Sequence, residues 1–343
     1  MVFVPINCAI VGLEQIQKDW VDAIAQARDA GKINIVAVAQ LQMGSARNLG
    51  QRLDAPFYVD FRRMMLEATP QIVILDRPRN FSLDFIIACI QQEIGIFSLG
   101  PPVQNLNEAR KLSLMLEPVT PLLYIWPRMT SSWAMRQCRN SEDYLSGLRF
   151  LAGNWTGITH SRARDWPAAQ ASVRSLSVLA WDACRTVIET LGVPASVFAA
   201  VQGELGNRDR FTDVNGSVCM TLRFIEATAS LVVCDHDSPL TRTLSLFNAS
   251  QLVTISDHAY NVRAASNGEK LEQDSAPAQS FDLPWKPLLA ELDEFCTQFV
   301  APPTPDRGWP HFLTETAATL TAMMVSHRTG AAESPQHFRG LHG

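Results

Sequence analysis

The segment INCAIVGLEQIQKDW, residues 6–20, decides how the N-terminal part of this chain folds. Its first six residues are almost entirely apolar and predict a buried strand, and Gly12 follows them directly. From residue 19 to residue 30, apolar side chains recur at the spacing of one helix face, and Gly31 ends that run. A strand, a glycine turn and a helix therefore follow one another.

The alternation of strand and helix continues over the first 120 residues. Apolar runs predict further strands, and helical periodicity predicts helices between them. The predicted strands are residues 33–39, 58–59, 71–75 and 95–99, and the predicted helices are residues 45–53, 61–68, 83–92 and 107–116. Strands this apolar are buried on both faces, so the pattern predicts a doubly wound parallel sheet of the Rossmann type.

From about residue 122 the pattern changes to short segments in which apolar and polar residues alternate. Such segments favour antiparallel strands with one solvent-facing side. We predict strands at residues 122–125, 158–164, 196–201, 218–225, 228–234, 243–247 and 252–256, and helices at residues 141–151, 174–191, 285–299 and 312–327. The predicted fold class is therefore α/β. Residues 1–121 form the Rossmann-type domain, residues 122–330 an α+β domain with an open mixed, mostly antiparallel sheet, and residues 331–343 a flexible tail.

Composition argues against several classes of function. The 343 residues carry a formal net charge of −5 without a Lys/Arg-rich block, so we expect neither nucleic acid nor a membrane as a partner. No apolar stretch reaches the ~18 residues that a membrane span needs. The seven cysteines are scattered and form no CxxC pair, which predicts free thiols in a reducing, cytoplasmic compartment and no metal site.

A series of stretches carries a family resemblance. They are AIVGLEQIQKDW, VAVAQ, PQIVILDRP, GIFSLGPP, LAWDACRTVIETLG, RFTDVNGSVCMTLRF, TASLVVC and TAATLTAMMVSHRTG. In their order and spacing, the chain resembles the glucose–fructose oxidoreductase / inositol dehydrogenase (Gfo/Idh/MocA) family over nearly its whole length, although no single motif is intact. The resemblance implies a nicotinamide-binding N-terminal domain, hydride transfer to or from sugars, cyclitols or related carbonyl compounds, and homodimers or homotetramers that pack through the second sheet.

The glycine turn departs from the family pattern. The three glycines of G-x-G-x-x-G fall on Gly12, Glu14 and Gln17. Gly12 allows the tight turn, but a carboxylate ~5 Å from a phosphate charge costs about 3 kcal/mol at an effective dielectric constant of about 20. Alternatively, Glu14 turns outward and caps the start of the helix. If NAD(P) binds at all, the resemblance assigns its contacts to Gly12, Leu13, Gln15, Gln40, Pro78, Gly100 and Pro101.

Three catalytic positions of the family also differ. The family's Glu-Lys-Pro falls on Leu99-Gly100-Pro101, so a glycine replaces the lysine that assists proton transfer. The family's Asp and His, four residues apart on one helix, fall on Val178 and Asp182. Asp182 is a candidate base if burial raises the pKa of its carboxyl, and otherwise it forms an ion pair with Arg185 one turn later.

Basic and aromatic residues are candidates for a rebuilt pocket. His160, Arg162 and Arg164 alternate along one predicted strand and therefore share a face. On the pocket side they would bind a carboxylate, a phosphate or a uronic acid, and on the solvent side they would only aid solubility. The candidates are His160 and Asp182 as acid or base, and Arg128, Arg162, Arg164, Trp181 and Arg185 as pocket residues.

We therefore expect a Gfo/Idh/MocA-like protein with degenerate cofactor and catalytic motifs. It would act as a non-catalytic binding or regulatory paralogue that recognises a small sugar-like or anionic ligand. The family offers a precedent in a sugar-responsive transcriptional co-regulator. The alternative is an active NAD(P)-dependent oxidoreductase whose acid/base site is rebuilt from Asp182 or His160.

Overall fold

The computed structural model describes most of the chain. The described residues are 4–12, 18–40, 43–76, 83–116, 123–140, 142–158, 168–203, 210–211, 216–276, 286–300 and 309–339. The chain divides into two compact units. Unit 1 comprises Met1–Val103, Arg110–Trp126 and Phe281–Pro310, and unit 2 comprises Gln104–Ala109, Pro127–Ser280 and His311–Gly343.

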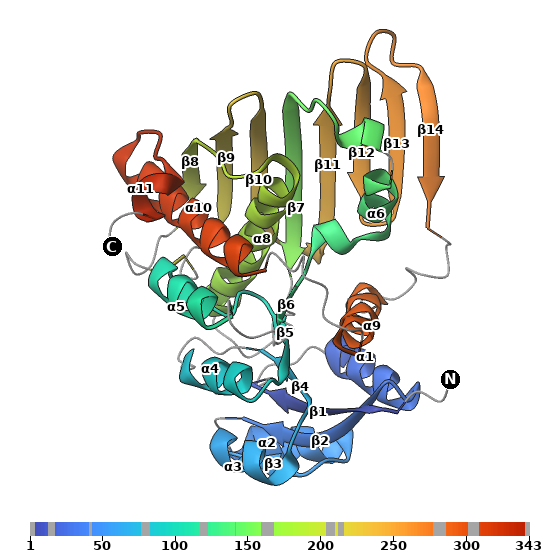
Figure 1. The fold of residues 1–343 in the computed structure, drawn as a ribbon, viewed down its shortest axis with the longest axis vertical. Helices are drawn as coiled ribbons and strands as arrows, with labels where there is room; N and C mark the ends of the chain where they lie inside the picture. The colour runs from blue at the N-terminus through green and yellow to red at the C-terminus, as the bar shows by residue number, and fades with distance from the viewer. Residues whose placement is uncertain are drawn as a thin grey trace. The chain divides into compact units, whose positions relative to one another are not determined.

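Unit 1 is built on a six-stranded parallel sheet with the strand order β3-β2-β1-β4-β5-β6 (Figure 1). Its strands are β1 (Ile6–Val11), β2 (Ile33–Ala39), β3 (Phe57–Tyr58), β4 (Ile72–Leu75), β5 (Gly95–Leu99) and β6 (Leu123–Trp126). Its helices are α1 (Lys18–Asp29), α2 (Met43–Leu53), α3 (Phe61–Ala68), α4 (Leu83–Gln91), α9 (Lys286–Val300) and most of α5 (Leu106–Leu116). The predicted doubly wound parallel sheet is confirmed.

A segment distant in sequence completes the core of unit 1. Helix α9 contacts α1, β5 and β6. Phe295 packs against Phe97, with 5.5 Å between ring centroids, and the Tyr124 hydroxyl donates to the Glu291 carboxylate over 2.9 Å. Sequence analysis placed all of residues 122–330 in the second domain, whereas β6 and α9 belong to unit 1. The apolar face of α9 shows that the helix is buried, but it does not show against which sheet.

Unit 2 is built on an eight-stranded sheet with the order β14-β13-β12-β11-β7-β10-β9-β8. Its strands are β7 (Phe150–Ile158), β8 (Ser196–Gln202), β9 (Ser217–Arg223), β10 (Thr228–Pro239), β11 (Thr241–Phe247), β12 (Gln251–Ser256), β13 (Ala259–Ala264) and β14 (Lys270–Ser275). Only β7 and β10 pair in parallel, so the predicted open mixed, mostly antiparallel sheet is confirmed.

The helical elements of unit 2 are η1 (Met129–Ser131), α6 (Trp133–Arg139), α7 (Glu142–Leu145), α8 (Ala168–Leu191), α10 (Trp309–Thr329) and α11 (Pro335–Arg339). Helices α6, α8 and α10 lie on one face of the sheet, and α8 contacts β7 and β10 (Figure 1). Along β8, β9 and β11, buried and more exposed side chains alternate, as a sheet with one covered face requires.

Two local predictions in unit 2 are wrong. Residues 141–151 were expected to be one helix, but α7 has four residues, Gly147 takes a left-handed φ of 60°, and β7 begins at Phe150. Residues 331–343 were expected to be a flexible tail, yet residues 331–339 include α11 and a backbone bridge from Glu333 to Val197. Both errors arise because partners distant in sequence decide these segments, and periodicity does not detect them.

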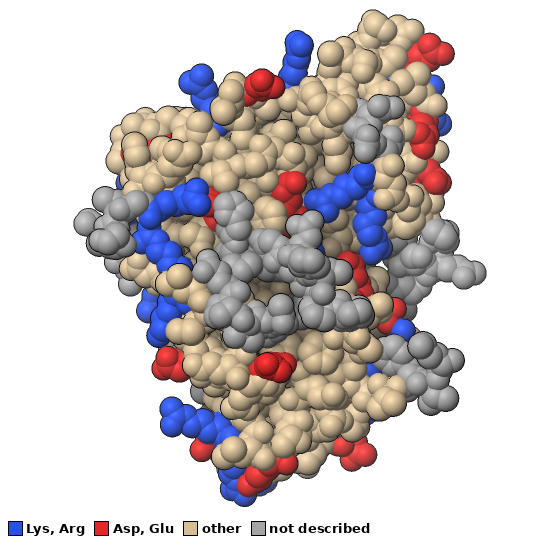
Figure 2. Space-filling model, viewed as in Figure 1, with Lys and Arg blue, Asp and Glu red and all other residues tan. Residues whose placement is uncertain are grey.

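Positive and negative side chains are mixed on the visible surface. In the view of Figure 2, Lys and Arg side chains occur in small groups with Asp and Glu among them. Within the part of the chain that the structure describes, no helix has both the length and the apolar character needed to cross a bilayer.

Candidate functional site

The carboxyl edge of the sheet in unit 1 has the backbone of a nucleotide site. The order of the strands reverses beside β1, so its end and that of β4 form the switch point where α/β sheets bind ligands. Gly12 lies there with a left-handed φ of 83°, and its N–H donates to the Ala39 carbonyl over 2.9 Å. Asp76 follows β4 and donates its N–H to the Val11 carbonyl over 2.9 Å, which places a buried carboxyl beside this turn.

The turn after β5 is suited to glycine. Gly100 stands where the resemblance expects a catalytic lysine, and its φ of 109° lies in a region that residues with a side chain rarely adopt. The buried Ser98 hydroxyl donates to the Gly100 carbonyl over 2.7 Å and helps to fix this conformation. The backbone itself has therefore adapted to the absence of a side chain at residue 100.

The structure describes four of the seven residues predicted to contact NAD(P), which are Gly12, Gln40, Gly100 and Pro101. Gln40 follows β2 directly and is only 1% exposed. Pro101 is partly buried and offers no N–H donor. Leu13, Gln15 and Pro78 lie outside the described residues, as do Glu14 and Gln17. The turns at Gly12 and Gly100 are therefore present, while three of the predicted NAD(P) contacts stay predictions.

Asp182 on α8 is the centre of a buried hydrogen-bond network in unit 2. Its carboxylate is 0% exposed and accepts from three separate elements. The Met129 N–H of η1 donates to Oδ1 over 2.8 Å, and the Trp155 indole N–H of β7 donates to Oδ2 over 2.9 Å. The third donor is Arg242 of β11, which reaches Oδ2 over 2.9 Å. Both oxygens are therefore occupied by donors from the protein.

The same network continues to a second carboxylate. Arg242 also contacts Asp257, through Nη2 at 2.7 Å and Nε at 2.8 Å from the same oxygen. Burial raises the pKa of Asp182 above its ordinary value, although Arg242 and the N–H groups of Met129 and Trp155 act to lower it. The sequence alternative of an Asp182–Arg185 ion pair is corrected, because the partner of Asp182 is Arg242 and that of Arg185 is Glu189.

The neighbours of Asp182 on α8 are part of the core. Val178, at the position of the family's catalytic aspartate, is buried and apolar. Trp181, expected to line a pocket, is 1% exposed and packs against Phe211 with 5.6 Å between ring centroids. These positions contribute packing rather than an exposed reactive group.

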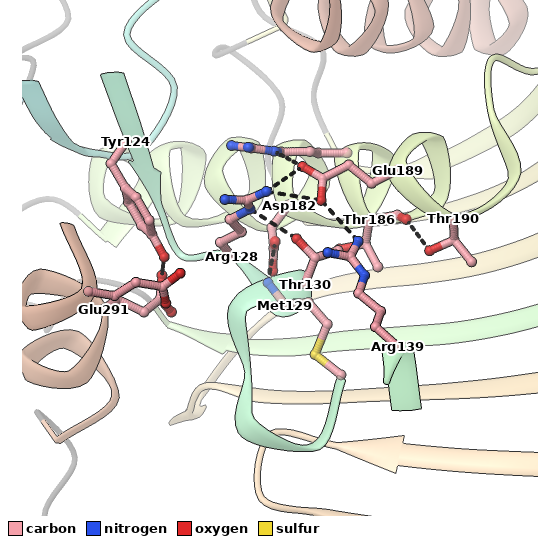
Figure 3. Close-up of polar contacts among 12 residues, drawn as sticks. Tyr124, Arg128, Met129, Thr130, Arg139, Asp182, Thr186, Glu189, Thr190 and Glu291 are labelled. Atoms are coloured by element: carbon pink, nitrogen blue, oxygen red, sulfur yellow. Dashed lines mark hydrogen bonds and ion pairs between the residues drawn. The ribbon is translucent and has the colours of Figure 1, made fainter. Parts of the chain in front are cut away.

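Glu189, in the last turn of α8, forms ion pairs with the predicted pocket residues Arg128 and Arg185. Arg185 Nε lies 2.7 Å from its carboxylate, Arg128 Nη2 lies 3.2 Å away, and Arg139 of α6 lies 3.3 Å away. Figure 3 shows the Arg128 and Arg139 side chains directed to Glu189. Although burial acts to raise it, Arg185, Arg128 and Thr130 hold the pKa of Glu189 well below its ordinary value. Arg128 and Arg185 thus bind a carboxylate of the chain itself.

Two main partners in these networks, Arg242 and Glu189, were not among the residues predicted from the sequence. A usable signal existed for Arg242, because it shares the inward face of β11 with Leu244 and Leu246. A charged residue on the apolar side of an alternating strand indicates a buried partner. His160, Arg162 and Arg164 lie outside the described residues. Among the described residues, no group of three or more His, Cys, Asp and Glu side chains is suited to hold a metal ion.

A known protein family matches the N-terminal part of the chain. The model of the family described as "Oxidoreductase family, NAD-binding Rossmann fold" (GFO_IDH_MocA) matches residues 6–119. The match covers less than half of the chain, and within it the chain is similar to the Gfo/Idh/MocA family. The resemblance found in the sequence is thereby confirmed. A search of curated proteins finds no significant match.

Solved structures share the fold over nearly the whole chain. Levoglucosan dehydrogenase in complex with NADH and L-sorbose is 13% identical, with a TM-score of 0.78, and the match covers 96% of this chain and 98% of that one. GenD2 from gentamicin A biosynthesis in complex with NAD is 14% identical, with a TM-score of 0.74 and coverage of 97% of both chains.

An oxidoreductase from Agrobacterium radiobacter in complex with NAD⁺, L-tartaric acid and magnesium is 10% identical. Its TM-score is 0.75, and the match covers 97% of this chain and 99% of that one. At these identities the likeness establishes the fold alone, and the function must be argued from the side chains.

Proposed function

We propose that this chain is a non-catalytic ligand-binding or regulatory protein built on the Gfo/Idh/MocA fold. The observation that carries the proposal is the environment of Asp182, the one ionisable group left at the two catalytic positions of α8. Its two oxygens accept from Met129, Trp155 and Arg242, and the side chain is fully buried. A base must reach the proton that it removes, and a carboxylate held in this way serves structure instead.

The turn after β5 supports the same conclusion independently. A lysine at residue 100 would need a backbone conformation other than the φ of 109° that Gly100 adopts. The main chain at residue 100 therefore favours glycine over a lysine. Together, α8 and this turn account for all three family positions that the resemblance assigns to acid/base chemistry.

Cofactor binding is the first test. Purified protein is titrated with NAD⁺, NADH, NADP⁺ and NADPH by calorimetry, with tryptophan quenching as a second readout. We expect no binding at millimolar cofactor, and we expect a variant with Glu14→Gly and Gln17→Gly to gain affinity because backbone can then approach the pyrophosphate. Micromolar binding with turnover of a sugar or cyclitol by the unaltered protein would overturn the proposal.

An active NAD(P)-dependent oxidoreductase with a rebuilt acid/base site is the second candidate. Two observations favour it. The Gly12 turn is retained, and the buried carboxyl of Asp76 lies at the switch point of the sheet. If turnover is found, Asp182→Asn and His160→Ala test the two acid/base candidates predicted from the sequence. Asp76→Asn tests a third candidate, which the structure places at the switch point. Turnover that survives all three substitutions would leave this candidate without its acid/base group.

The ligand of the proposed binding protein is a small sugar-like or anionic molecule. Support comes from the similar structures, whose ligands include L-sorbose and L-tartaric acid. A panel of sugars, cyclitols, uronic acids and sugar phosphates is screened by thermal shift without any nicotinamide. We expect at least one class to raise the melting temperature, because a ligand that binds only the folded state stabilises it. Stabilisation only when NAD(P) is also present would favour the oxidoreductase instead.

We further propose that the chain forms a homodimer or homotetramer through the helix-free face of the sheet in unit 2. Val232 of β10 pairs with Cys219 of β9, which pairs with Ala200 of β8, and all three side chains are exposed on that face. Phe198 on the same face is 47% exposed. Such a row of small and apolar side chains suits face-to-face packing of two sheets.

Thiol labelling tests this surface directly. Cys219 is exposed, whereas Cys8, Cys89, Cys138, Cys184 and Cys296 are buried. We expect slow labelling of Cys219 in concentrated, native protein and faster labelling on dilution, as dissociation uncovers the face. Fast labelling at every concentration, in protein that sediments as an oligomer, would place the interface elsewhere.

A further inference from the structure

The last strand of the sheet in unit 2, β8, is an edge that lacks a free row of donors. An edge strand normally presents alternate N–H groups to solvent, where another chain can add to it. In β8 the N–H groups that point away from β9 belong to Val197, Ala199 and Val201. Each of them donates to an acceptor near the C-terminus of the chain.

The three acceptors come from the end of α10 and the residues that follow it. Val197 N–H donates to the Glu333 carbonyl over 2.7 Å, and Glu333 N–H returns a bond to the Val197 carbonyl over 2.9 Å. Ala199 N–H donates to the Ser326 hydroxyl over 3.0 Å, and Val201 N–H donates to His327 Nδ1 over 3.2 Å. Main chain and side chains together therefore replace a neighbouring strand.

The segment is fixed to the rest of unit 2 at several points. Gly330, with a φ of 69°, reverses the chain after α10. The buried Ser326 hydroxyl accepts from Ala199 and donates to the Ala331 carbonyl over 2.6 Å, so it joins the edge strand to the returning chain. Farther on, Arg339 of α11 forms an ion pair with Glu315 of α10. We call residues 326–339 the C-terminal strap.

The opposite edge of the same sheet is protected in a different way. All six residues of β14 are exposed, and Lys270, Glu272 and Asp274 place charge along it. Charged edge strands resist pairing with other chains. In contrast, residues 196–201 of β8 read SVFAAV, without a charge or a proline, which is the composition of segments that self-pair. The edge that is covered is the one whose sequence would otherwise associate.

We propose that the C-terminal strap closes the β8 edge and prevents two copies of this chain from joining edge to edge. The partner that it excludes is β8 of a second copy, added antiparallel to form one continuous sheet. The strap thereby leaves the face of the sheet, rather than its edge, as the surface available for assembly. This inference is independent of cofactor binding and of the face dimer described above.

Truncation tests the strap. A chain ending at Val325 lacks all three acceptors, and a chain ending at Arg339 is the matched control, because it loses only residues 340–343. By sedimentation velocity we expect the shorter chain to reach about twice the mass of the control, in a concentration-dependent way, as pairing of two copies requires. A shorter chain that keeps the control's mass and its circular dichroism spectrum would overturn the proposal.

A second substitution identifies the edge. In the shorter chain, Val201→Pro removes an outward N–H, and edge strands tolerate proline where the N–H would face solvent. We expect it to abolish the added association, whereas Val201→Ala, which keeps the donor, leaves it unchanged. Association that persists in the proline variant would show that β8 does not mediate it.

Hydrogen exchange gives a test that does not depend on truncation. In the full chain, the Ala199 and Val201 amides should be protected, although they lie on an edge. Ser326→Ala should raise exchange at Ala199 by at least about tenfold, as loss of about 1.4 kcal/mol of local protection implies, with little change at amides that face β9. Unprotected edge amides in the native protein, or an equal rise across β8 and β9, would contradict the strap.

Discussion

The turns of the sheet in unit 1 and the polar side of α8 in unit 2 have departed from the family pattern in opposite ways. After β1 and β5, the main chain still turns at Gly12 and Gly100, while the side chains expected to bind cofactor are replaced. On α8, a carboxylate is still present at residue 182, but new donors from η1, β7 and β11 surround it. In the proposed function, the first region keeps the turns without the catalytic side chains, and the second uses Asp182 as a structural residue.

The two regions are therefore expected to contribute differently to the free energy of folding. A turn built on glycine needs no hydrogen-bond partner for a side chain, so its presence costs little free energy of folding. A buried carboxylate is stable only with its donors, since an unpaired buried charge costs several kcal/mol. Substitutions in the α8 network should therefore affect folding strongly, whereas substitutions at the turns should affect it less.

The largest effect is expected for Asp182→Ala. It removes the acceptor of two buried N–H groups and of Arg242 Nη1, although Arg242 keeps its ion pair with Asp257. We expect a loss of about 3 kcal/mol in the free energy of unfolding, measured with urea. Asp182→Asn is the control for shape and should lose less, because the amide oxygen still accepts. A loss under about 1 kcal/mol for the alanine variant would mean that Asp182 is not a structural residue, and its role as a base would regain support.

Glu189→Gln should have the next largest effect, and it should depend on pH. Because the arginines hold the pKa of Glu189 below its ordinary value of 4.5, its charge stabilises the fold above that pH. This stabilisation is lost as the pH falls below 4.5. We expect the variant to be less stable by about 1.5–3 kcal/mol at neutral pH, and the difference to shrink as acid is added. Asp182 is unchanged in both proteins, so its own titration cancels in the comparison.

The pH profile decides the interpretation of this substitution. A constant difference from neutral to acid conditions would mean that glutamine disturbs packing around residue 189, and not that the charge is important. Chemical denaturation at matched ionic strength keeps the screening of exposed ion pairs equal between the two proteins.

Gly100→Lys tests the turn after β5 and restores the residue type of the family. A side chain at a φ of 109° is strained, so we expect a loss of about 1–2 kcal/mol and no dehydrogenase activity. Gly44→Lys is the matched control, because Gly44 lies in the first turn of α2 with open space around it. A stable Gly100→Lys protein with new turnover would show that the site needs only its lysine.

Prediction from sequence succeeded where the information is local. The strands and helices of residues 1–116 follow from apolar runs and periodicity, and their predicted ends lie within two residues of the observed ones. The candidate site was harder, because its partners are distant in sequence. Asp182 was identified through the family resemblance, but its partners Trp155 and Arg242 come from other strands, and no pattern on α8 indicates them. The cofactor residues Leu13, Gln15 and Pro78, and the basic group at residues 160–164, remain predictions.

The smallest expected effect is that of losing the hydrogen bond from Trp155 to Asp182, measured apart from the packing of the indole ring. Trp155 of β7 and Trp126 of β6 are both buried, but only Trp155 donates to a carboxylate. Among the described residues, the indole nitrogen of Trp126 has no hydrogen-bond partner. Trp→Phe removes a similar ring volume at both sites. The part of the loss in free energy of unfolding that both variants share therefore reports packing. We expect Trp155→Phe to lose about 1 kcal/mol more than Trp126→Phe, because Asp182 Oδ2 keeps Arg242 as a donor. Equal losses would mean that Arg242 and Met129 alone hold Asp182, and that the indole contributes only its shape.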